Sequence, residues 1–446
     1  MMGNKSIKQS WWQMTSIQIG GAICLPIIMV GQELARNYGF AKAALSIIIG
    51  NVLLFLIGVV KVKMAYENKK TTIRNAEGYF GNKGIKFFAL NIIIGLLGWF
   101  AIQLNVISVS FIKGLKTMFG YSPVGITCMS LVFGLIITMV TLRGIKAIKT
   151  LSYISIPILT LSLIYTIYKA FMYGSAVAVA PVISTSALGI SLVLASTLVV
   201  IIDLPTYYRF SRSLKDSCIS IFVTMVLATS AIELAGTYIA TRLPGKTILE
   251  LLTAYSGFSY QIIILFFLAL AGWTASSINL YSAAMTLEKI FPKLSHLTRT
   301  LMLGALGTGL ACFNLLAKFQ TILSLIGILI SSMGAVIVTK YLVRGVIPNL
   351  SKSSVLNLIA WGLGVAQGFL VFFNVFSITG KEIIDAFLMS AIAALFFALL
   401  KVRKVVWSSE MCQKIMQNDT KKSLRRCSKG IVFVAKVVLG GIIAFF

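Results

Sequence analysis

The sequence predicts an all-α membrane protein with twelve transmembrane helices. Of its 446 residues, 58% are hydrophobic and 12% are charged, whereas a soluble globular protein carries roughly 25% charged residues. The mean hydropathy of the chain is +0.93. Because a helix that spans a bilayer needs about 20 mostly apolar residues, a chain of this length can hold about twelve of them. We therefore expect one polytopic membrane domain.

Twelve apolar segments follow one another along the chain and are joined by short polar loops. We place them at about residues 15–35, 41–60, 86–112, 121–141, 151–170, 187–208, 216–240, 258–287, 299–317, 321–343, 354–377 and 383–400. These segments form a twelve-helix core, 1–404. A basic tail follows at 405–446, and its short apolar end at 431–446 predicts an interfacial or re-entrant helix rather than a further span.

Basic residues alternate between successive loops. If the N-terminus is cytoplasmic, 31 of the 40 Lys and Arg residues fall on the inner side and 9 on the outer side. Lys and Arg gather in the cytoplasmic loops of membrane proteins, so this pattern predicts a multi-pass protein of the cytoplasmic membrane with its N-terminus inside. We interpret the net charge of +28 as topology with some contact to anionic lipid, and not as nucleic-acid binding.

Helix-breaking residues occur at mid-membrane in the first and sixth segments. The first contains Gly20, Gly21 and Pro26, and the sixth contains Pro205 just after Asp203. Gly permits departure from helical geometry and Pro removes a backbone donor, so each segment is expected either to kink or to open. An opened helix is tolerated in a membrane only around a cavity or ligand, which favours a site between two inverted repeats.

The spacing of these breakers predicts two inverted five-helix repeats with broken helices 1 and 6. Repeat one covers about 12–170, repeat two about 187–345, and two extra helices follow at about 354–402. In such an arrangement the two interrupted helices face each other near the middle of the bilayer.

The third segment carries polar groups on one face. Trp99 and Gln103 are four residues apart and hence one helical turn apart. The indole offers a flat surface for stacking and the carboxamide offers a donor and an acceptor, which is how proteins hold nucleobases. The alternative is structural, with Trp99 packed against neighbouring helices and Gln103 hydrogen-bonded to one of them.

Five motifs occur in order along about residues 12–400. They are GWFAIQ in the third segment, PTYYRFSRS at the end of the sixth, GWTASSINLYSAAM in the eighth, LSLIGILISSMGAVIVTKYLVRG in the tenth and NLIAWGLGVAQG in the eleventh. In this order and at these ranks, they resemble the motifs of the nucleobase-cation symporters, also called the purine and cytosine permeases.

The resemblance implies a secondary active transporter. It would import a nucleobase or related heterocycle, of the cytosine, purine or hydroxymethylpyrimidine type, by cation symport and alternating access. The resemblance implies that Trp99 stacks on the substrate, that Gln103 hydrogen-bonds it and that Asn279 contacts it. Ser196 and Thr197 occupy the place of a second stacking aromatic on the sixth helix, so half of that sandwich is missing.

The resemblance also implies a binding site for the coupling cation. Its four residues are Gly20, Ile23, Ala271 and Thr274. The first three would offer backbone carbonyls and Thr274 a hydroxyl, which are ligands that suit Na⁺. Ala275 stands where the family often has a second hydroxyl, which weakens the case for sodium. Ser276 could compensate, although it points about 100° further round the helix.

A proton is the alternative coupling ion, and it needs an ionisable group within the membrane. The candidates are Asp203 and Glu233. Asp203 could equally cap backbone donors that Pro205 frees. Glu33 lies close to Arg36 and is interpreted as a surface ion pair. The coupling ion is thus Na⁺ or H⁺, and no other metal and no cofactor is expected.

Two further functions stay open. An amino-acid permease of the same fold would bind a carboxylate at a broken-helix N-terminus and would not need Trp99. A transport-inactive membrane sensor would bind a base without accumulating it. Catalysis is not expected, because the sequence shows no paired carboxylates, metal-ligand spacing, activated nucleophile or Walker A motif.

Overall fold

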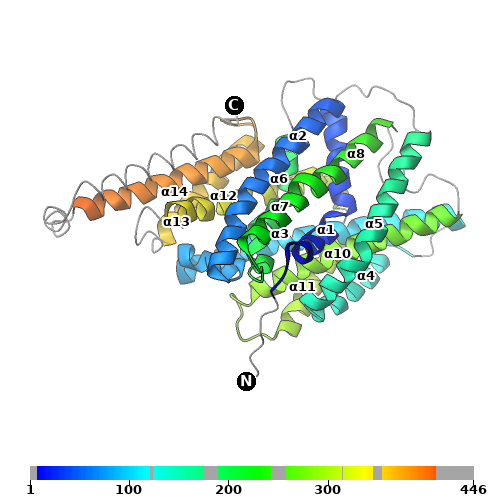
Figure 1. Cartoon of the computed structure of the whole chain (residues 1–446), viewed down its shortest axis with the longest axis horizontal. Helices are drawn as coiled ribbons and strands as arrows, with labels where there is room; N and C mark the ends of the chain where they lie inside the picture. Colours follow the sequence, from blue (N-terminus) through cyan, green and yellow to red (C-terminus); the bar gives the residue numbers. More distant parts are fainter. Residues whose placement is uncertain are drawn as a thin grey trace. The chain divides into compact units, whose positions relative to one another are not determined.

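The computed structural model describes residues 8–120, 124–173, 189–242, 258–313, 315–344 and 354–407. Its helices are α1 (Trp11–Ala22), α2 (Leu25–Asn68), α3 (Thr72–Phe119), α4 (Ile126–Leu142), α5 (Ile145–Tyr173), α6 (Ile190–Tyr208), α7 (Leu214–Phe222), η1 (Val223–Thr229), α8 (Ser230–Arg242), α10 (Phe258–Leu287), α11 (His296–Ala311), η2 (Leu316–Lys318), α12 (Phe319–Val343), α13 (Ser354–Phe372) and α14 (Glu382–Trp407) (Figure 1). This all-α architecture confirms the predicted fold class.

Within the described residues, each of the twelve predicted apolar segments overlaps at least one helix. Eight helices of the described residues are long and apolar enough to cross a membrane. The two longest helices each contain one glycine with a positive φ, 76° at Gly39 in α2 and 63° at Gly81 in α3. Glycine adopts such angles without strain, so Gly39 separates the first predicted segment from the second. The predicted tail segment at 431–446 lies outside the described residues.

The first predicted segment is interrupted at mid-helix. Helix α1 ends at Ala22, and Cys24 has an extended backbone with φ −138° and ψ 157°. Helix α2 then begins at Leu25 with Pro26 in its first turn. Proline is favoured there because its missing N–H would have no intrahelical partner. The interruption predicted near Gly21 is therefore present, centred on residues 23–24.

The structure differs from the prediction in the sixth segment. Helix α6 is continuous from Ile190 to Tyr208 and contains Pro205 in its last turn. This turn stays helical because Tyr207 anchors it: its hydroxyl lies 2.8 Å from the Ser282 hydroxyl of α10. The Asp203 carboxylate also accepts a hydrogen bond from that serine, so it is not capping an opened backbone. The proline costs one hydrogen bond without opening the helix.

The seventh segment contains a π-helical stretch, η1, between α7 and α8. Side chains stabilise it by reaching back five residues: Thr229 Oγ1 donates to the Thr224 carbonyl at 2.9 Å and Ser230 Oγ to the Met225 carbonyl at 3.3 Å. Stretches of π-helix are rare and often accompany functional sites. Here the stretch carries Met225, which is buried.

The chain divides into two compact units. The first comprises Met1–Thr72 and Ala89–Ile330, and the second comprises Ile73–Phe88 and Ser331–Phe446. In the second unit α13 packs closely on α14, since a Cβ atom at Gly364 would lie 2.5 Å from the Ala386 carbonyl oxygen. The first unit holds every residue that the sequence predicts for substrate or cation binding.

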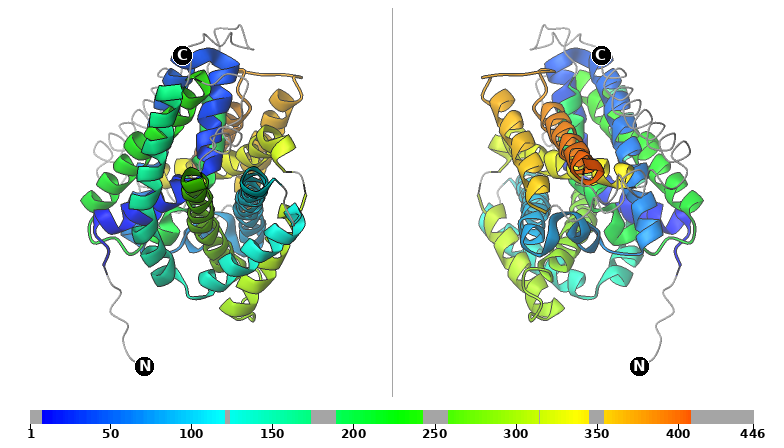
Figure 2. Two further views of the ribbon diagram at one scale, coloured as in Figure 1. Left: turned by 90° about the vertical axis from the view of Figure 1, so that its right-hand side faces the viewer. Right: turned by 90° about the vertical axis from the view of Figure 1, so that its left-hand side faces the viewer.

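Helix α2 is the centre of packing in the first unit, where it runs beside α8 (Figures 1 and 2). The contact is close because it is made at glycines: a Cβ atom at Gly31 would lie 1.8 Å from the Glu233 carbonyl oxygen, and one at Gly236 would lie 2.0 Å from the Ile28 carbonyl oxygen. Small residues at helix contacts are typical of membrane proteins, where backbones approach closely.

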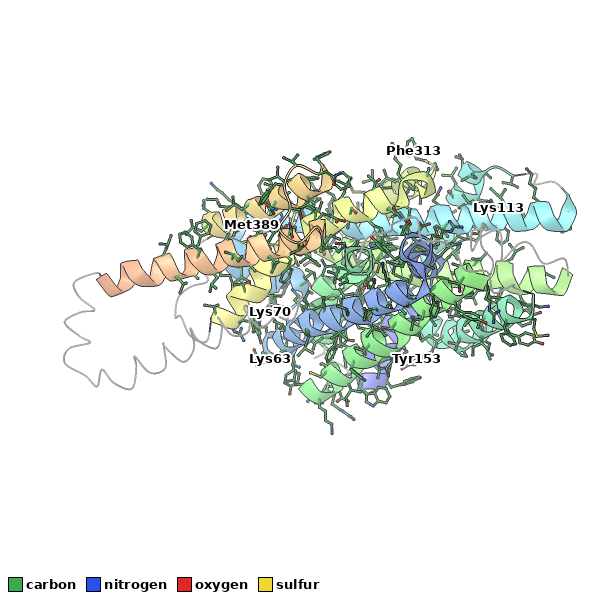
Figure 3. All side chains as sticks on the ribbon, turned by 90° about the horizontal axis from the view of Figure 1, so that it is seen from above. Lys63, Lys70, Lys113, Tyr153, Phe313 and Met389 are labelled. Atoms are coloured by element: carbon green, nitrogen blue, oxygen red, sulfur yellow. The ribbon has the colours of Figure 1, made fainter. Side chains whose placement is uncertain are left out.

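Three lysines of this unit can be located in Figure 3. Lys63 and Lys70, predicted inside, lie near one end of α2, whereas Lys113, predicted outside, lies far from them (Figure 3).

Candidate functional site

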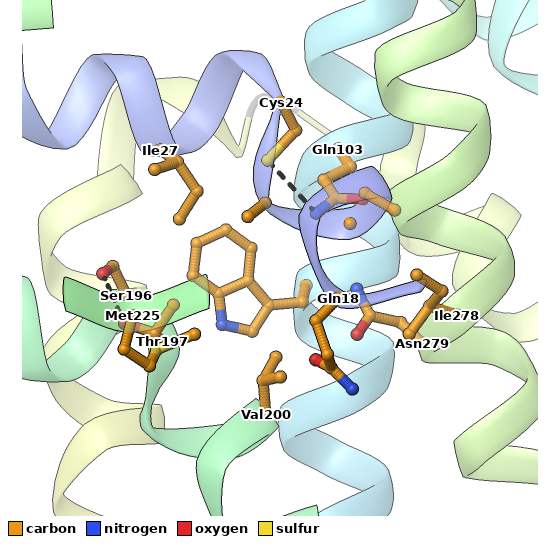
Figure 4. A pocket seen from close by; sticks show the side chains of 14 residues that line it. Gln18, Cys24, Ile27, Gln103, Ser196, Thr197, Val200, Met225, Ile278 and Asn279 are labelled. Atoms are coloured by element: carbon orange, nitrogen blue, oxygen red, sulfur yellow. Dashed lines mark hydrogen bonds between the residues drawn. The ribbon is translucent and has the colours of Figure 1, made fainter. Parts of the chain in front are cut away.

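A cavity lies in the first unit where the α1–α2 interruption meets α3, α6, η1 and α10 (Figure 4). Its lining residues are Gln18, Gly21, Ala22, Cys24, Ile27, Trp99, Gln103, Ser196, Thr197, Val200, Met225, Ala275, Ile278 and Asn279. The five predicted substrate-binding residues, Trp99, Gln103, Ser196, Thr197 and Asn279, are all among them. Residues far apart in the sequence thus line one space, as the prediction requires.

Trp99 brings a large apolar surface and one free donor to this cavity. The side chain is 3% exposed, and its indole N–H has no hydrogen-bond partner among the described residues. A buried indole N–H normally has one. The structural alternative, in which Trp99 only packs against neighbouring helices, leaves this donor unexplained.

Gln103 is held in place from two sides. Its Nε2 lies 3.8 Å from the Cys24 sulfur at the α1–α2 interruption (Figure 4), and the Ser276 hydroxyl of α10 donates to its Oε1 at 3.3 Å. A carboxamide has two donor hydrogens and two acceptor lone pairs, so capacity remains for a ligand. The Ser276 hydroxyl is thus directed at Gln103 in this structure.

Two more carboxamides line the same side of the cavity as Gln103, those of Gln18 and Asn279 (Figure 4). Each residue is 5% exposed, and Gln18 Nε2 has no partner in the described part of the chain. Asn279 was predicted and Gln18 was not. The sequence did hold a signal, because Gln18 is a polar residue three positions before Gly21 in the segment predicted to open.

The opposite side of the cavity carries Ser196, Thr197 and Met225 (Figure 4). The Ser196 hydroxyl donates to the Val193 carbonyl at 2.7 Å and lies 3.2 Å from the Thr197 hydroxyl. The side where the family resemblance implies a second aromatic thus offers two hydroxyls and a thioether. Met225 was missed because nothing in the sequence marks the π-helical stretch that brings it here.

Glu233 lies directly behind Ser196. The carboxyl group is fully buried, its Oε2 accepts from the Asn51 amide of α2 at 2.6 Å, and its Oε1 lies 3.5 Å from the Ser196 hydroxyl. One hydroxyl therefore separates this carboxyl group from the cavity. This placement is consistent with the prediction of an intramembrane ionisable residue near the site.

Asp203, the other predicted proton carrier, is not among the cavity-lining residues. Its carboxylate accepts hydrogen bonds from the Thr206 hydroxyl at 2.7 Å and from the Ser282 hydroxyl. It also interacts electrostatically with Lys61 of α2, whose ammonium group is fully buried and has no hydrogen-bond partner within the described residues. Asp203 therefore connects α6 to α10 and faces a compensating charge.

Three of the four predicted cation ligands come together. The Thr274 hydroxyl lies 2.6 Å from the Gly20 carbonyl oxygen of α1 and 3.0 Å from that of Ala271. Ile23 follows one turn later as the C-cap of α1, with its N–H donating to the Ile19 carbonyl at 2.9 Å. Among the described residues, Ile23 is not a hydrogen-bond partner of Thr274. The carbonyl and hydroxyl oxygens present suit a hard cation.

Comparison with known proteins identifies the family of the chain. The family model described as permease for cytosine/purines, uracil, thiamine, allantoin matches residues 3–355. The cytosine permease of Escherichia coli (strain K12) is 24% identical over 348 residues, which cover 76% of this chain and 80% of that permease.

Two solved structures share the fold. Mhp1, a nucleobase-cation-symport-1 family transporter in a closed conformation with bromovinylhydantoin bound, aligns with a TM-score of 0.72 at 15% identity, covering 95% of this chain and 97% of Mhp1. A Na⁺-coupled sialic acid symporter aligns with a TM-score of 0.65 at 11% identity, covering 88% and 90%. The family resemblance and the absence of an enzymatic role are confirmed: the chain belongs to the permease family for cytosine/purines, uracil, thiamine and allantoin, and is a multi-pass membrane transporter.

Proposed function

We propose that this transporter imports a nucleobase or closely related heterocycle, of the cytosine, purine or hydroxymethylpyrimidine type, by cation symport across the cytoplasmic membrane. The observation that carries the proposal is the cavity itself. It combines the Trp99 indole with the carboxamides of Gln18, Gln103 and Asn279, and none of its fourteen lining residues is charged. A nucleobase presents a flat ring and an edge of donors and acceptors, which these groups match.

Each predicted substrate residue has a role in this proposal. Trp99 stacks on the ring and Gln103 reads its edge together with Asn279. Ser196 and Thr197 border the opposite side, where their small side chains and Met225 leave room that a second indole would fill. The free Trp99 N–H and Gln18 amide favour a substrate with ring carbonyl oxygens, because both are donors.

The coupling cation is proposed to bind at Gly20, Ile23, Ala271 and Thr274. Helix α1 ends at Ala22, so its last carbonyls lack intrahelical donors and its dipole presents its negative end there. A bound cation supplies positive charge that holds this end of α1 against α10. In the alternative, Glu233 or Asp203 carries a proton, and Glu233 is the better placed because only Ser196 separates it from the cavity.

Alternating access is proposed to proceed by rocking of the bundle formed by the first, second, sixth and seventh segments against the remaining helices, with the N-terminus inside. The contacts of α2 with α6 and α8 hold this bundle together. The interruption after Ala22 places the cavity where the bundle meets α3 and α10, so a bound substrate contacts both parts.

An amino acid is the second candidate substrate. The observation in its favour is the α2 N-terminus, which begins beside the cavity residue Cys24 and could receive a carboxylate. The cavity, however, offers no charged partner for an α-ammonium group, and an amino acid would leave the Trp99 surface without a ring to stack on unless its side chain were aromatic.

The test is a binding screen on the purified chain. Thermal shifts and radioligand binding are measured for cytosine, uracil, hypoxanthine, hydroxymethylpyrimidine and a set of amino acids. Trp99→Ala should lose binding of the active heterocycle, while Trp99→Phe, which keeps a ring, should retain part of it. Trp361→Ala in α13, a half-buried residue of the other unit, is the matched control. Binding that survives in Trp99→Ala, or a response to amino acids alone, would overturn the proposal.

Reconstituted vesicles then distinguish a transporter from a sensor. Uptake of the active heterocycle is followed under an inward Na⁺ gradient, an inward H⁺ gradient and no gradient. Accumulation under one of the gradients supports symport. Binding without accumulation under either gradient would instead favour a transport-inactive sensor.

A further inference from the structure

A cluster of oxygen atoms surrounds the Thr274 hydroxyl. The carbonyl oxygens of Gly20, Ala271 and Leu270 lie 2.6, 3.0 and 3.1 Å from Thr274 Oγ1. The Leu270 and Ala271 carbonyls also accept the backbone N–H groups four residues later in α10, whereas the Gly20 carbonyl lies in the last turn of α1. Three carbonyl oxygens and one hydroxyl oxygen thus converge at this point, which is a favourable environment for a cation.

Ser152 of α5 lies directly beside Gly20 of α1. A Cβ atom at Gly20 would lie 2.7 Å from Ser152 Oγ, so the approach of α5 to α1 is possible because residue 20 is glycine. Ser152 is fully buried and its hydroxyl has no hydrogen-bond partner among the described residues. The serine therefore lies directly against the residue whose carbonyl contacts Thr274.

The free hydroxyl of Ser152 differs from two other hydroxyls on α5. On the same helix, Ser162 and Thr166 each donate to the carbonyl four residues earlier, at 2.8 Å, which is how hydroxyls are normally satisfied inside membrane helices. Ser155, one turn after Ser152, is also buried without a partner in the described chain. The face of α5 that meets Gly20 thus carries two hydroxyls that do not bond to their own helix.

We propose that Ser152 is a ligand of the coupling cation and that this cation is Na⁺. Ser152 then supplies from α5 the hydroxyl that Ala275 does not supply from α10. The proposal rests on the proposed cation symport and deepens it, because it names the ion and adds a helix to the site. Bound Na⁺ would connect α1, α5 and α10.

The chemistry of the ligands selects the ion. Carbonyl and hydroxyl oxygens are hard ligands, and those of Gly20, Ala271, Thr274 and Ser152 are all neutral. Without a carboxylate, such a set favours a monovalent cation over a divalent one. None of these groups takes up a proton near neutral pH, so a proton is not the ion held here.

The test is Na⁺ binding measured without substrate. Melting of the full-length protein is followed against NaCl concentration, with choline chloride keeping the ionic strength constant. The wild type should be stabilised by Na⁺. Ser152→Ala should shift the Na⁺ midpoint upward by about tenfold or more, as loss of one hydroxyl contact to a charged group implies. Ser162→Ala, on the same helix and with its hydroxyl already satisfied, should leave the midpoint unchanged.

Two readouts separate a ligand from a structural serine. In choline buffer, Ser152→Ala should melt at the wild-type temperature or slightly above it, because the variant no longer buries an unpartnered hydroxyl. A structural serine would lower the melting temperature there. In the Ser152→Ala background, Ala275→Ser should restore part of the Na⁺ response by returning a hydroxyl from α10. If Ser152→Ala does not fold, Ser152→Cys tests the same ligand with a soft sulfur atom.

The proposal is overturned if the wild type melts identically in NaCl and choline chloride, or if Ser152→Ala keeps the wild-type Na⁺ midpoint. Heterocycle binding at saturating concentration is measured on the same samples. Binding of a base with no Na⁺ response would reject Ser152 as a ligand and leave the proposed transport standing. A Na⁺ response that Ser152→Ala weakens, with no base bound, would support the cation site and reject the proposed substrate.

Discussion

Substitutions of Glu233, whose buried carboxyl group is hydrogen-bonded to Asn51, test whether Glu233 serves structure or proton coupling. In the wild type, the Asn51 amide lies 2.6 Å from Glu233 Oε2. Glu233→Gln keeps an acceptor oxygen for this amide. Its new amide can donate to the Ser196 hydroxyl, which itself donates to the Val193 carbonyl. The variant therefore retains its hydrogen bonds, and we expect its free energy of unfolding to fall by no more than about 1 kcal/mol.

Glu233→Ala is the disruptive counterpart. It leaves the buried Asn51 amide without the carboxylate, which costs about 1–3 kcal/mol, and it opens a cavity where Glu233 is fully buried. We expect a loss of about 2–4 kcal/mol in total. Because the two side chains are in contact, Asn51→Ala combined with Glu233→Ala should cost less than the sum of the single changes.

The functional assay is uptake into vesicles under a Na⁺ gradient and under a H⁺ gradient. If Na⁺ is the coupling ion, Glu233→Gln should keep Na⁺-driven accumulation within about threefold of the wild type, a difference of less than 1 kcal/mol. A variant that binds the base and folds normally but accumulates nothing would refute this reasoning. It would make Glu233 the proton carrier.

Three further outcomes follow from contacts in the first unit. Gly31→Ala places a methyl group against the backbone at Glu233, 1.8 Å from its carbonyl oxygen, and should destabilise the protein by about 3 kcal/mol or more in thermal unfolding. Tyr207→Phe removes the hydroxyl that lies 2.8 Å from Ser282 and should cost about 1–3 kcal/mol, with an unchanged melting temperature contradicting its role in anchoring α6. Gln18→Ala should weaken heterocycle binding about fivefold with little effect on stability, because its Nε2 makes no protein hydrogen bond that the change would remove.

Features that depend on local sequence were the predictable ones. Runs of apolar residues placed the twelve segments, and Gly20, Gly21 and Pro26 marked the interruption of the first helix. These signals act within one turn of the chain, so they can be read without knowledge of neighbouring helices. Trp99 and Gln103 were identified by their spacing on one helix face and by the family resemblance, and they line the same cavity.

Features set by contacts between distant segments were not predictable. Pro205 predicted a kink or an opening, but the hydrogen bond of Tyr207 to α10 keeps the turn helical. Met225 enters the cavity through a π-helical stretch whose register depends on packing. Ser152 is 132 positions from Gly20 in the sequence, and only the close approach of α5 to α1 brings them together. Each case depends on which helix happens to be the neighbour.

The placement of charge in the first unit gives the site one more property. The cavity-lining residues are all neutral, the Asp203 carboxylate faces the Lys61 ammonium, and Glu233 is enclosed behind Ser196. If a neutral base and one Na⁺ move together, the only charge that crosses is that of the ion. Each 100 mV of inside-negative potential then adds about 2.3 kcal/mol to the driving force, or roughly 50-fold in accumulation. With Na⁺ outside the vesicles, uptake should therefore rise when an inside-negative potassium diffusion potential is imposed. Uptake that does not respond to this potential would mean that a second charge moves in compensation.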